Sequence, residues 1–301
     1  MKRLLCGWAA WALWPLGASA QSLPQPPAEV ASGATGMEVA PPASPDALPT
    51  PPEVQRPDWE AAFGLILGYQ PEYMGSDRQA WRLRPAFLLR WGRFAISNGS
   101  GMVTRSNRDV ARGLSYSLVD SRRWRASVGL RVDQGRSDGD SGYLRGMGDI
   151  DATVRARLYL RYQLTPEWHW NASWNPDILG RGGGALGDVE LAWERERAWW
   201  DGAPPLRLGI GGGLSFANGQ YMQRQYGVTA AQSLASGYPV YEPGSGLQDV
   251  HAGIVLRGEF MSGWGMQLGL GVSRLLGPAV DSPLTRKTLG WGVNAGLMRR
   301  F

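Results

Sequence analysis

The stretch IDATVRARLYLRYQL, residues 150–164, decides the fold class of this chain. Its even-numbered residues are apolar or aromatic, whereas its odd-numbered residues are polar or charged and include Arg155, Arg157 and Arg161. Successive side chains of a β-strand point to opposite faces. Strict alternation of this length therefore predicts a strand with one apolar face and one polar face.

The same period of two recurs from Trp59 to the end of the chain, where a helical period is hard to find. We count about 12 such strands, an even number, which suits a closed barrel of antiparallel strands. The first apolar residues of these strands are Trp59, Trp81, Phe94, Leu114, Trp124, Ile150, Trp168, Val189, Leu206, Val250, Trp264 and Trp291.

The connections between the strands alternate in length, and this favours a membrane barrel over a soluble sandwich or a lipocalin-like barrel. One set is short, as at Gly92 and Ser262-Gly263, whereas the other includes the long stretches 134–149 and 218–248. Transmembrane barrels have short periplasmic turns and longer extracellular loops. The pattern therefore predicts a barrel that spans the bacterial outer membrane.

Aromatic residues gather where the strands meet the short turns, as in the interfacial girdle of a membrane protein. The polar faces, rich in Arg and Gly, could not form the interior of a soluble sandwich without leaving buried charges. We therefore expect an all-β, transmembrane, antiparallel up-and-down β-barrel whose apolar side chains face lipid. The expected girdle contains Trp59, Trp91, Phe94, Trp124, Trp168, Trp199, Phe260, Trp264 and Phe301, and a weaker band at the far ends contains Tyr69, Trp81, Phe216 and Trp291.

The chain ends inside an alternating segment, LGWGVNAGLMRRF at residues 289–301. A strand edge left open in lipid would carry unpaired backbone groups. We therefore expect this last strand to pair with the first one, which begins near Trp59, and to close the sheet.

The chain is expected to have three regions. Residues 1–20 have the pattern of an export signal, with Lys2 and Arg3, an apolar run and an Ala18-Ser19-Ala20 cleavage site. Residues 21–57 contain ten prolines and few large apolar side chains, so we expect a disordered periplasmic segment, either a plain spacer or a partner-binding tail. Residues 58–301 form the barrel. The single cysteine, Cys6, lies in the signal, so disulfides and Cys chemistry are excluded from the mature chain.

Several motifs resemble the MltA-interacting protein (MipA)/OmpV family of outer-membrane proteins, and the resemblance covers nearly all of the chain after Asp58. One departure is Arg299, where the terminal signature of the family usually carries Tyr or another apolar residue. The motifs are Tyr69-Gln70-Pro71-Glu72-Tyr73-Met74-Gly75-Ser76-Asp77, Arg84-Pro85, Gly146-Met147-Gly148-Asp149, Tyr226-Gly227-Val228, Ser236-Gly237-Tyr238-Pro239-Val240-Tyr241 with Gly246-Leu247-Gln248-Asp249, and Arg274-Leu275-Leu276-Gly277 through Asp281-Ser282-Pro283-Leu284.

The resemblance implies a non-enzymatic protein of the outer membrane. The founding member of the family is regarded as a scaffold that joins a lytic transglycosylase to a murein synthase of the penicillin-binding type, and other members are described as porins or adhesins. The expected partners are therefore outer-membrane lipid and lipopolysaccharide, the barrel-assembly machinery and these murein enzymes. No nucleic acid is expected, because arginines lining the lumen of an exported barrel explain the net charge of +5.

The face predicted to line the lumen is strongly basic on one wall. Two interpretations stay open: a narrow, weakly anion-selective pore guided by these arginines, or interior ion pairs that plug the barrel. The candidate charge ladder consists of Arg82, Arg84, Arg123, Arg125, Arg155, Arg157 and Arg161 with Asp188, Glu190 and Glu194, and Arg90, Arg131 and Glu259 share its face.

The two histidines, His169 and His251, both fall on the predicted lumen face, at opposite ends of the barrel. Ser245 and Asp249 lie close to His251 in sequence, but no nucleophile-elbow context surrounds them. No His and carboxylate set has the spacing of metal ligands. We therefore expect no enzyme, no cofactor and no metal.

If the first and last strands are neighbours, two loops share the outer rim beside the closure seam. Cations there can meet lipopolysaccharide phosphates, or mutual hydrogen bonds and salt bridges can hold the seam. The candidate seam residues are Asp77, Arg78, Asp281, Arg286 and Lys287. The segment from Asn218 to Gln248 is long enough to fold into the mouth or to bind a partner.

Overall fold

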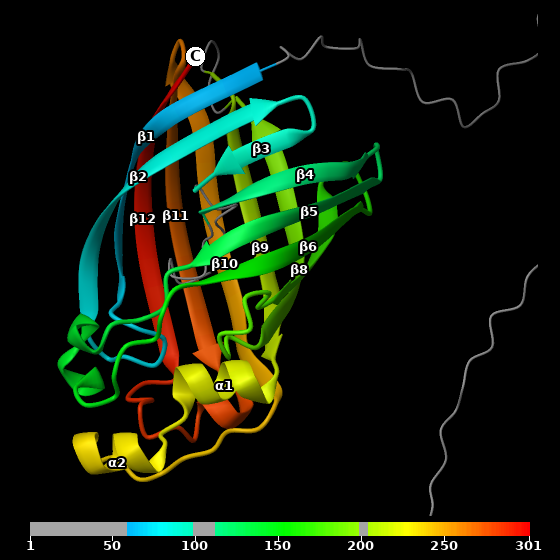
Figure 1. Ribbon diagram of the computed structural model, residues 1–301. Helices are drawn as coiled ribbons and strands as arrows, with labels where there is room; N and C mark the ends of the chain where they lie inside the picture. Colours follow the sequence, from blue (N-terminus) through cyan, green and yellow to red (C-terminus); the bar gives the residue numbers. More distant parts are fainter. Residues whose placement is uncertain (1–58, 99–111, 199–203) are drawn as a thin grey trace, which may run out of the picture. The chain divides into compact units, whose positions relative to one another are not determined.

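The protein is a closed barrel of 12 strands in a computed structural model that describes residues 59–98, 112–198 and 204–301. All pairs are antiparallel, and each strand is hydrogen-bonded to its predecessor and successor in the chain (Figure 1). This confirms the predicted up-and-down barrel. The expected signal peptide, residues 1–20, and the expected Pro-rich segment, residues 21–57, lie outside the described residues.

The strands range from 4 to 16 residues in length. Their bounds are β1 Trp59–Pro71, β2 Gln79–Trp91, β3 Phe94–Ser97, β4 Arg112–Asp120, β5 Trp124–Asp133, β6 Thr153–Gln163, β7 Trp168–Pro176, β8 Ala185–Arg197, β9 Leu206–Ala217, β10 Gly246–Met261, β11 Trp264–Leu275 and β12 Leu289–Arg300.

The chain closes as expected, because β12 pairs with β1 from Ala62↔Arg300 to Tyr69↔Val293. The longest alternating stretch forms β6, which starts at Thr153 rather than at Ile150. Ile150 instead makes an isolated bridge to Arg136, so the loop before β6 folds back on itself and shortens the strand.

Apolar side chains cover the outside of the barrel. Leu83, Leu158 and Leu268 are 66%, 51% and 50% exposed, whereas residues at inward positions such as Ala62 and Val255 are 2% exposed. The exposed apolar side is the one that hydrocarbon covers in an outer-membrane barrel. The predicted assignment of apolar side chains to the lipid face therefore holds.

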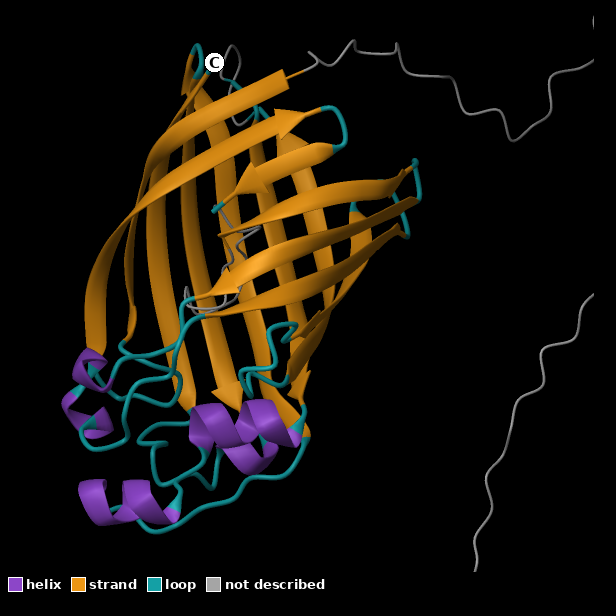
Figure 2. Ribbon diagram, viewed as in Figure 1, coloured by secondary structure: helices purple, strands orange, loops and turns teal. Residues whose placement is uncertain are grey.

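The short connections require glycine at two tight turns, because Gly92 and Gly263 have φ values of +54° and +73°. The long connections contain short helices at the opposite end (Figure 2). None of the helices in the described residues is long and apolar enough to cross a membrane. They are η1 Asp138–Asp140, η2 Gly142–Leu144, α1 Gly219–Tyr226, α2 Ala230–Ser236 and η3 Gly277–Ala279.

The helices α1 and α2 differ from the sequence expectation, which found no helical period. Each is too short for a clear period, and each is started by a cap. The side chain of Asn218 accepts the backbone N–H of Tyr221, and Thr229 forms a reciprocal capping box with Gln232.

Candidate functional site

The long-loop end of the barrel is covered by a cap with its own apolar core. Tyr221, Met222 and Tyr226 of α1 are at most 2% exposed. They pack with Leu186 at the start of β8, Ala217 at the end of β9, Leu275 at the end of β11, Ala279 of η3 and Met74 of the β1–β2 loop.

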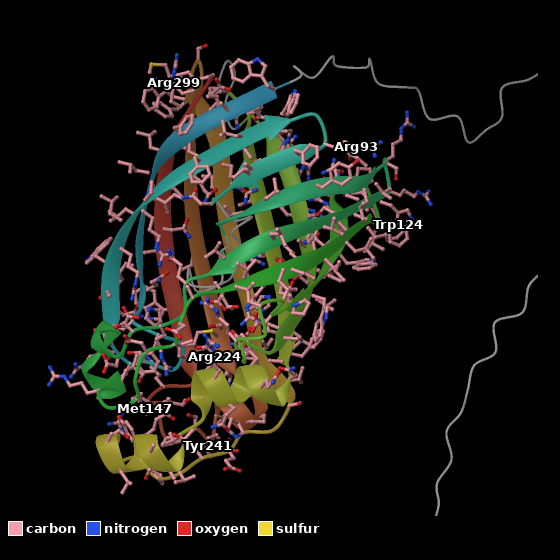
Figure 3. The ribbon with its side chains drawn as sticks, in the orientation of Figure 1. Arg93, Trp124, Met147, Arg224, Tyr241 and Arg299 are labelled. Carbon is pink, nitrogen blue, oxygen red and sulfur yellow. The ribbon has the colours of Figure 1, made fainter. Side chains whose placement is uncertain are left out.

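A second apolar cluster joins further loops to the cap. Met147 of the β5–β6 loop packs with Val228 and Leu284, and Tyr238 and Tyr241 lie against them. Figure 3 shows Met147 and Tyr241 together at this end, with Arg224 of α1 above them. The cap therefore binds the β1–β2, β5–β6, β9–β10 and β11–β12 loops into one unit.

Hydrogen bonds inside the cap link its helices and loops. Gln248 donates to the Tyr226 hydroxyl at 3.1 Å, and Ser282 donates to the Tyr226 carbonyl at 2.6 Å. The Arg224 guanidinium donates to the carbonyl oxygens of Arg181 and Asp151, in two different loops. Buried polar groups that find such partners add rigidity at low cost.

Arg155, one of the predicted ladder residues, fastens the lumen wall to the cap. Its Nε lies 2.8 Å from Asp133 Oδ2. Its terminal nitrogens donate to the carbonyl oxygens of Asn175, Gly184 and Gly183 at 3.2, 3.0 and 2.8 Å. The guanidinium also lies 5.2 Å from the ring centre of Tyr221. A guanidinium with so many fixed acceptors is structural and is not exposed to passing solutes.

Asp177, in the β7–β8 loop, organises the same region. Burial opposes its charge, but hydrogen bonds from Thr153 Oγ1, Gly183 N and Leu179 N, together with the charge of Arg155, hold the pKa of its carboxyl below the ordinary value of 3.8. Thr153 donates at 2.6 Å and Gly183 at 2.8 Å. The carboxylate therefore stabilises this loop in its charged form.

The other predicted ladder arginines lie in separate environments. Arg161 lies 3.6 Å from Glu194, and Arg157 lies 4.9 Å from the ring centre of Tyr159. Arg125 pairs with Asp120 in solvent at the short-turn rim, and Arg123 is an exposed turn residue rather than a strand residue. Arg82 donates to the Glu72 carbonyl at 3.1 Å, and Arg131 donates to Asn175 Oδ1 at 2.9 Å. Of the acidic ladder residues, Asp188 accepts a hydrogen bond from Ser173 at 2.6 Å. Arg84 and Glu190 are partly buried.

The two histidines are buried, at 2% and 4% exposed for His169 and His251. His251 Nδ1 lies 2.8 Å from Asp249 Oδ1, and the Ser215 hydroxyl donates to the same oxygen at 3.2 Å. The Ser215 hydroxyl therefore directs its proton at the carboxylate. Ser245 accepts the N–H of Gly219 at 2.8 Å and so supports the start of α1. Within residues 59–98, 112–198 and 204–301, no three His, Asp or Glu side chains form a group that could hold a metal ion.

A cavity of about 730 Å³ lies at the short-turn end of the lumen, opposite the cap. Arg207 pairs with Glu196 at 2.7 Å, and Arg300 lies 3.9 Å from Glu259. All four of these side chains line the cavity, together with Arg257. This end therefore presents an open, charged recess.

The seam between β1 and β12 is held by backbone groups and one tyrosine. The N–H groups of Arg286 and Lys287 both donate to the Gly75 carbonyl, at 2.8 and 3.0 Å. The Tyr73 hydroxyl donates to the Leu284 carbonyl at 2.9 Å, and burial raises the pKa of Tyr73 well above its ordinary range. No salt bridge involving Asp77, Arg78, Asp281, Arg286 or Lys287 is present in the part of the chain that the structure describes.

Sequence reasoning missed the residues that build the cap core and its lumen contacts. Asn175, which is 2% exposed and links Arg131, Ser173 and the Leu186 carbonyl, gave no signal beyond its polarity. Tyr221 and Met222 lie in the connection between β9 and β10, where the alternation of apolar and polar residues that identifies strands does not apply. The capping sequence Thr229-Ala-Ala-Gln232 was a usable helix signal.

Comparison with known proteins places this barrel in a family. The model of the MltA-interacting protein MipA family matches residues 63–301, which is most of the chain and nearly all of the barrel. The chain belongs to the MipA family. None of the curated proteins compared with it matches.

Several solved outer-membrane proteins are similar to this MipA-family chain. The porin NanC is 8% identical, with a TM-score of 0.41, over 79% of this chain and 98% of NanC. OprB of Pseudomonas putida is 9% identical, with a TM-score of 0.40, over 81% and 94% of the two chains. The COG4313 outer membrane channel from P. putida F1 is 10% identical, with a TM-score of 0.37, over 84% and 99%.

The motifs that resemble the MipA family build the cap. Met147, Tyr226, Val228, Tyr241 and Leu284 all belong to those motifs and to the two apolar clusters.

The departure from the family pattern, Arg299, faces outward at the opposite end. Its guanidinium donates to the Ser262 carbonyl at 2.8 Å and lies over the rings of Trp264 and Phe301. The guanidinium thus packs against aromatic rings of the girdle, and cation–π contacts stabilise its charge there.

Proposed function

We propose that this protein is a non-enzymatic adaptor that holds a murein-cleaving lytic transglycosylase, and with it a murein synthase, at the outer membrane. The description of its family, MltA-interacting protein, motivates this proposal. The observation that carries it is the cored cap over the long-loop end, where Met222 and Val228 are 0% exposed. A barrel whose mouth is filled by packed loops suits anchoring better than bulk passage of solutes.

The orientation of the barrel supports docking at the other end. Short turns of outer-membrane barrels face the periplasm, which is where murein and its enzymes lie. The short-turn end carries the charged recess with Arg207 and Arg300, and the exposed Phe260 and Met261 line it too. A recess that combines charge with exposed apolar side chains fits the mixed character of transient protein interfaces.

A binding measurement tests the adaptor. The protein is placed in nanodiscs and titrated with a purified lytic transglycosylase of the MltA type. Arg207→Glu with Arg300→Glu reverses two exposed charges of the recess and is expected to weaken binding about tenfold, since each exposed contact contributes up to about 1 kcal/mol. The matched double variant Arg78→Glu with Arg286→Glu lies at the opposite end and is expected to bind as the wild type does.

Two outcomes count against the adaptor. Absence of binding by the folded wild-type protein removes the proposal. Equal binding by the recess variant and the wild type removes the recess as the docking surface.

A narrow, weakly anion-selective channel is the second candidate. The charges among the described lining residues of the recess favour it, because Arg207, Arg257 and Arg300 outnumber Glu196 and Glu259 there. A channel predicts stepwise currents in planar bilayers whose anion preference falls in Arg257→Gln. Currents that are insensitive to this substitution oppose the anion-guiding role.

A further inference from the structure

Arg274 occupies a position on β11 that otherwise faces lipid. Leu268, Leu270 and Val272 precede it in the same outward register, and all four side chains are exposed. A charged side chain on the lipid face is costly at mid-depth and nearly free of cost at the interface. Arg274 lies one residue from the long-loop end of β11, so it belongs at the level of the lipid headgroups.

Further cations stand around Arg274 on the same rim. Arg274 pairs in register with Leu289, the first residue of β12, two residues after Lys287. Arg78 and Arg286 lie on the ring of Tyr143, at 4.5 and 4.7 Å from its centre. In Figure 1 the green helical turns of the β5–β6 loop lie beside the lower end of β2.

These cations are held in place but have no carboxylate partner. The Gly75 carbonyl fixes the backbone of Arg286 and Lys287. Among the described residues no carboxylate lies within ion-pair distance of Arg274, Arg286 or Lys287. An exposed set of unpaired cations is complementary to an anionic ligand.

Aromatic rings mark the membrane interface directly below these cations. The ring centre of Tyr69 lies 4.8 Å from that of Trp81 and 5.9 Å from that of Trp291. Tyrosine and tryptophan prefer the headgroup level of a membrane. Trp81 comes three residues after Arg78, and Arg274 pairs with Leu289, two residues before Trp291, so these cations lie two to three residues further toward the long-loop rim than the aromatic rings.

An apolar groove of about 520 Å³ runs below the aromatic rings on the outer face of the barrel. The small side chain of Ala295 lies in it, between larger neighbours on β1 and β11 such as Leu67 and Leu268, which pair with it in register. Trp81 belongs both to the groove and to the aromatic cluster.

We propose that this face, across β10, β11, β12, β1 and β2, is a specific binding site for one lipopolysaccharide molecule of the outer leaflet. An acyl chain of lipid A occupies the groove, and its two phosphates contact Arg274 with Lys287 and Arg78 with Arg286. Lipopolysaccharide fits better than a phospholipid because the cations are spread over three strand ends and a single phosphate reaches only part of them. The site is independent of the periplasmic recess, so its failure leaves the adaptor proposal untouched.

Native mass spectrometry of the full-length barrel in detergent micelles tests the site with three probes. They are hexa-acyl lipid A with both phosphates, the same lipid A without phosphates, and dioleoyl phosphatidylglycerol. We expect the phosphorylated lipid A to bind most tightly, by about tenfold over each of the other two.

Two variants separate the headgroup contacts from the groove. Arg274→Gln with Lys287→Gln is expected to weaken binding of phosphorylated lipid A about tenfold and to leave binding of the dephosphorylated form unchanged. Ala295→Trp fills the groove and is expected to weaken binding of both forms. Controls are Arg93→Gln with Arg195→Gln at the opposite rim and Ala172→Trp on the outward face of β7, which are expected to bind as the wild type does.

Three results overturn the proposal. The phosphates play no part if dephosphorylated lipid A binds as well as the phosphorylated form. The site is one for phospholipid if phosphatidylglycerol binds as tightly as lipid A. The groove plays no part if Ala295→Trp binds as Ala172→Trp does. Heat-modifiable migration in gels shows in each case that the variant barrel is folded.

Discussion

The guanidinium of Arg155 combines one carboxylate and three carbonyl acceptors at the boundary between lumen and cap. The planar guanidinium meets several acceptors at once, which an ammonium on a flexible stem does not do. Parity in the sequence assigned Arg155 to the lumen face, but the sequence contained no information about these acceptors. They come from Asp133 in β5, Asn175 in β7, and Gly183 and Gly184 in the β7–β8 loop, all at least 20 residues from Arg155 in the chain.

Arg155→Lys keeps the charge and loses most of these hydrogen bonds. We expect it to destabilise the barrel by about 2–4 kcal/mol, because most of the four acceptors, the half-buried Asp133 carboxylate and three buried carbonyls, lose their donor. The midpoint of heat-induced unfolding, followed by gel migration, measures the loss. Arg195→Gln removes an exposed ion pair with Glu167 and is the control, with an expected change of about 0–1 kcal/mol. Equal losses in the two variants would contradict the structural role of Arg155.

The depressed pKa of Asp177 predicts a pH dependence of stability. A carboxyl whose pKa is lower in the folded than in the unfolded state stabilises the fold above the ordinary pKa of 3.8, and this contribution disappears as the pH falls through the lowered value. Asp177→Asn is therefore expected to lower the unfolding midpoint at neutral pH and to differ little from the wild type at about pH 2. A difference that stays constant or grows on acidification contradicts this cause.

At the scale of elements, the cap depends on close approach between the β5–β6 loop and α2. Gly146 has a φ of +81°, and a Cβ there would lie 2.6 Å from the Ala235 carbonyl oxygen. Gly148 has a similar φ of +70° but open space around it. Comparing an alanine substitution at Gly146 with one at Gly148 therefore separates the cost of backbone strain from the cost of the clash with α2.

Gly146→Ala is expected to loosen the cap, because it adds a clash to a backbone strain of about 1 kcal/mol or more. Gly148→Ala carries the strain alone. Limited proteolysis of the loops at 138–148 and 228–245 in nanodiscs measures the effect, and cleavage is expected to be faster in Gly146→Ala. Similar cleavage of both variants would show that the approach of α2 does not hold the cap.

The strands could be predicted from sequence, whereas for the cap the sequence indicated only a segment, Asn218 to Gln248, long enough to fold into the mouth or to bind a partner. A strand facing lipid on one side must alternate, so parity alone identifies its faces, as in Leu158 and Leu268. The cap instead assembles short segments from several loops, and residues such as Met222 and Leu284 are buried by tertiary contact only. The charge ladder was predicted on the same parity basis, which assigns a face to a strand residue but says nothing about its partners, such as Asn175, and does not apply to Arg123, which lies in a turn.

At the scale of the whole molecule, the barrel is defined by the closure of β1 on β12 and by an apolar exterior. Neighbouring residues on one strand therefore tolerate charge very differently. Leu268 faces outward near the middle of β11, whereas Gln267 faces inward and donates to Asn294 at 3.3 Å.

Leu268→Arg is expected to destabilise the barrel by about 2–4 kcal/mol, because it places a cation in hydrocarbon. Gln267→Arg is expected to cost less, because its guanidinium remains in the lumen. Refolding into lipid vesicles across a denaturant series measures both. A larger loss for Gln267→Arg would reverse the assignment of the two faces.

Closure of the long-loop mouth by the cap is tested most directly by electrical conductance in planar bilayers. Gly246 pairs with Ala217, so a short Gly-Ser turn can replace residues 219–244 and remove α1 and α2 without changing the strands. We expect the wild-type protein to leave the membrane current flat and the variant to give stepwise openings. The same behaviour from both proteins, whether conducting or silent, would contradict closure by the cap.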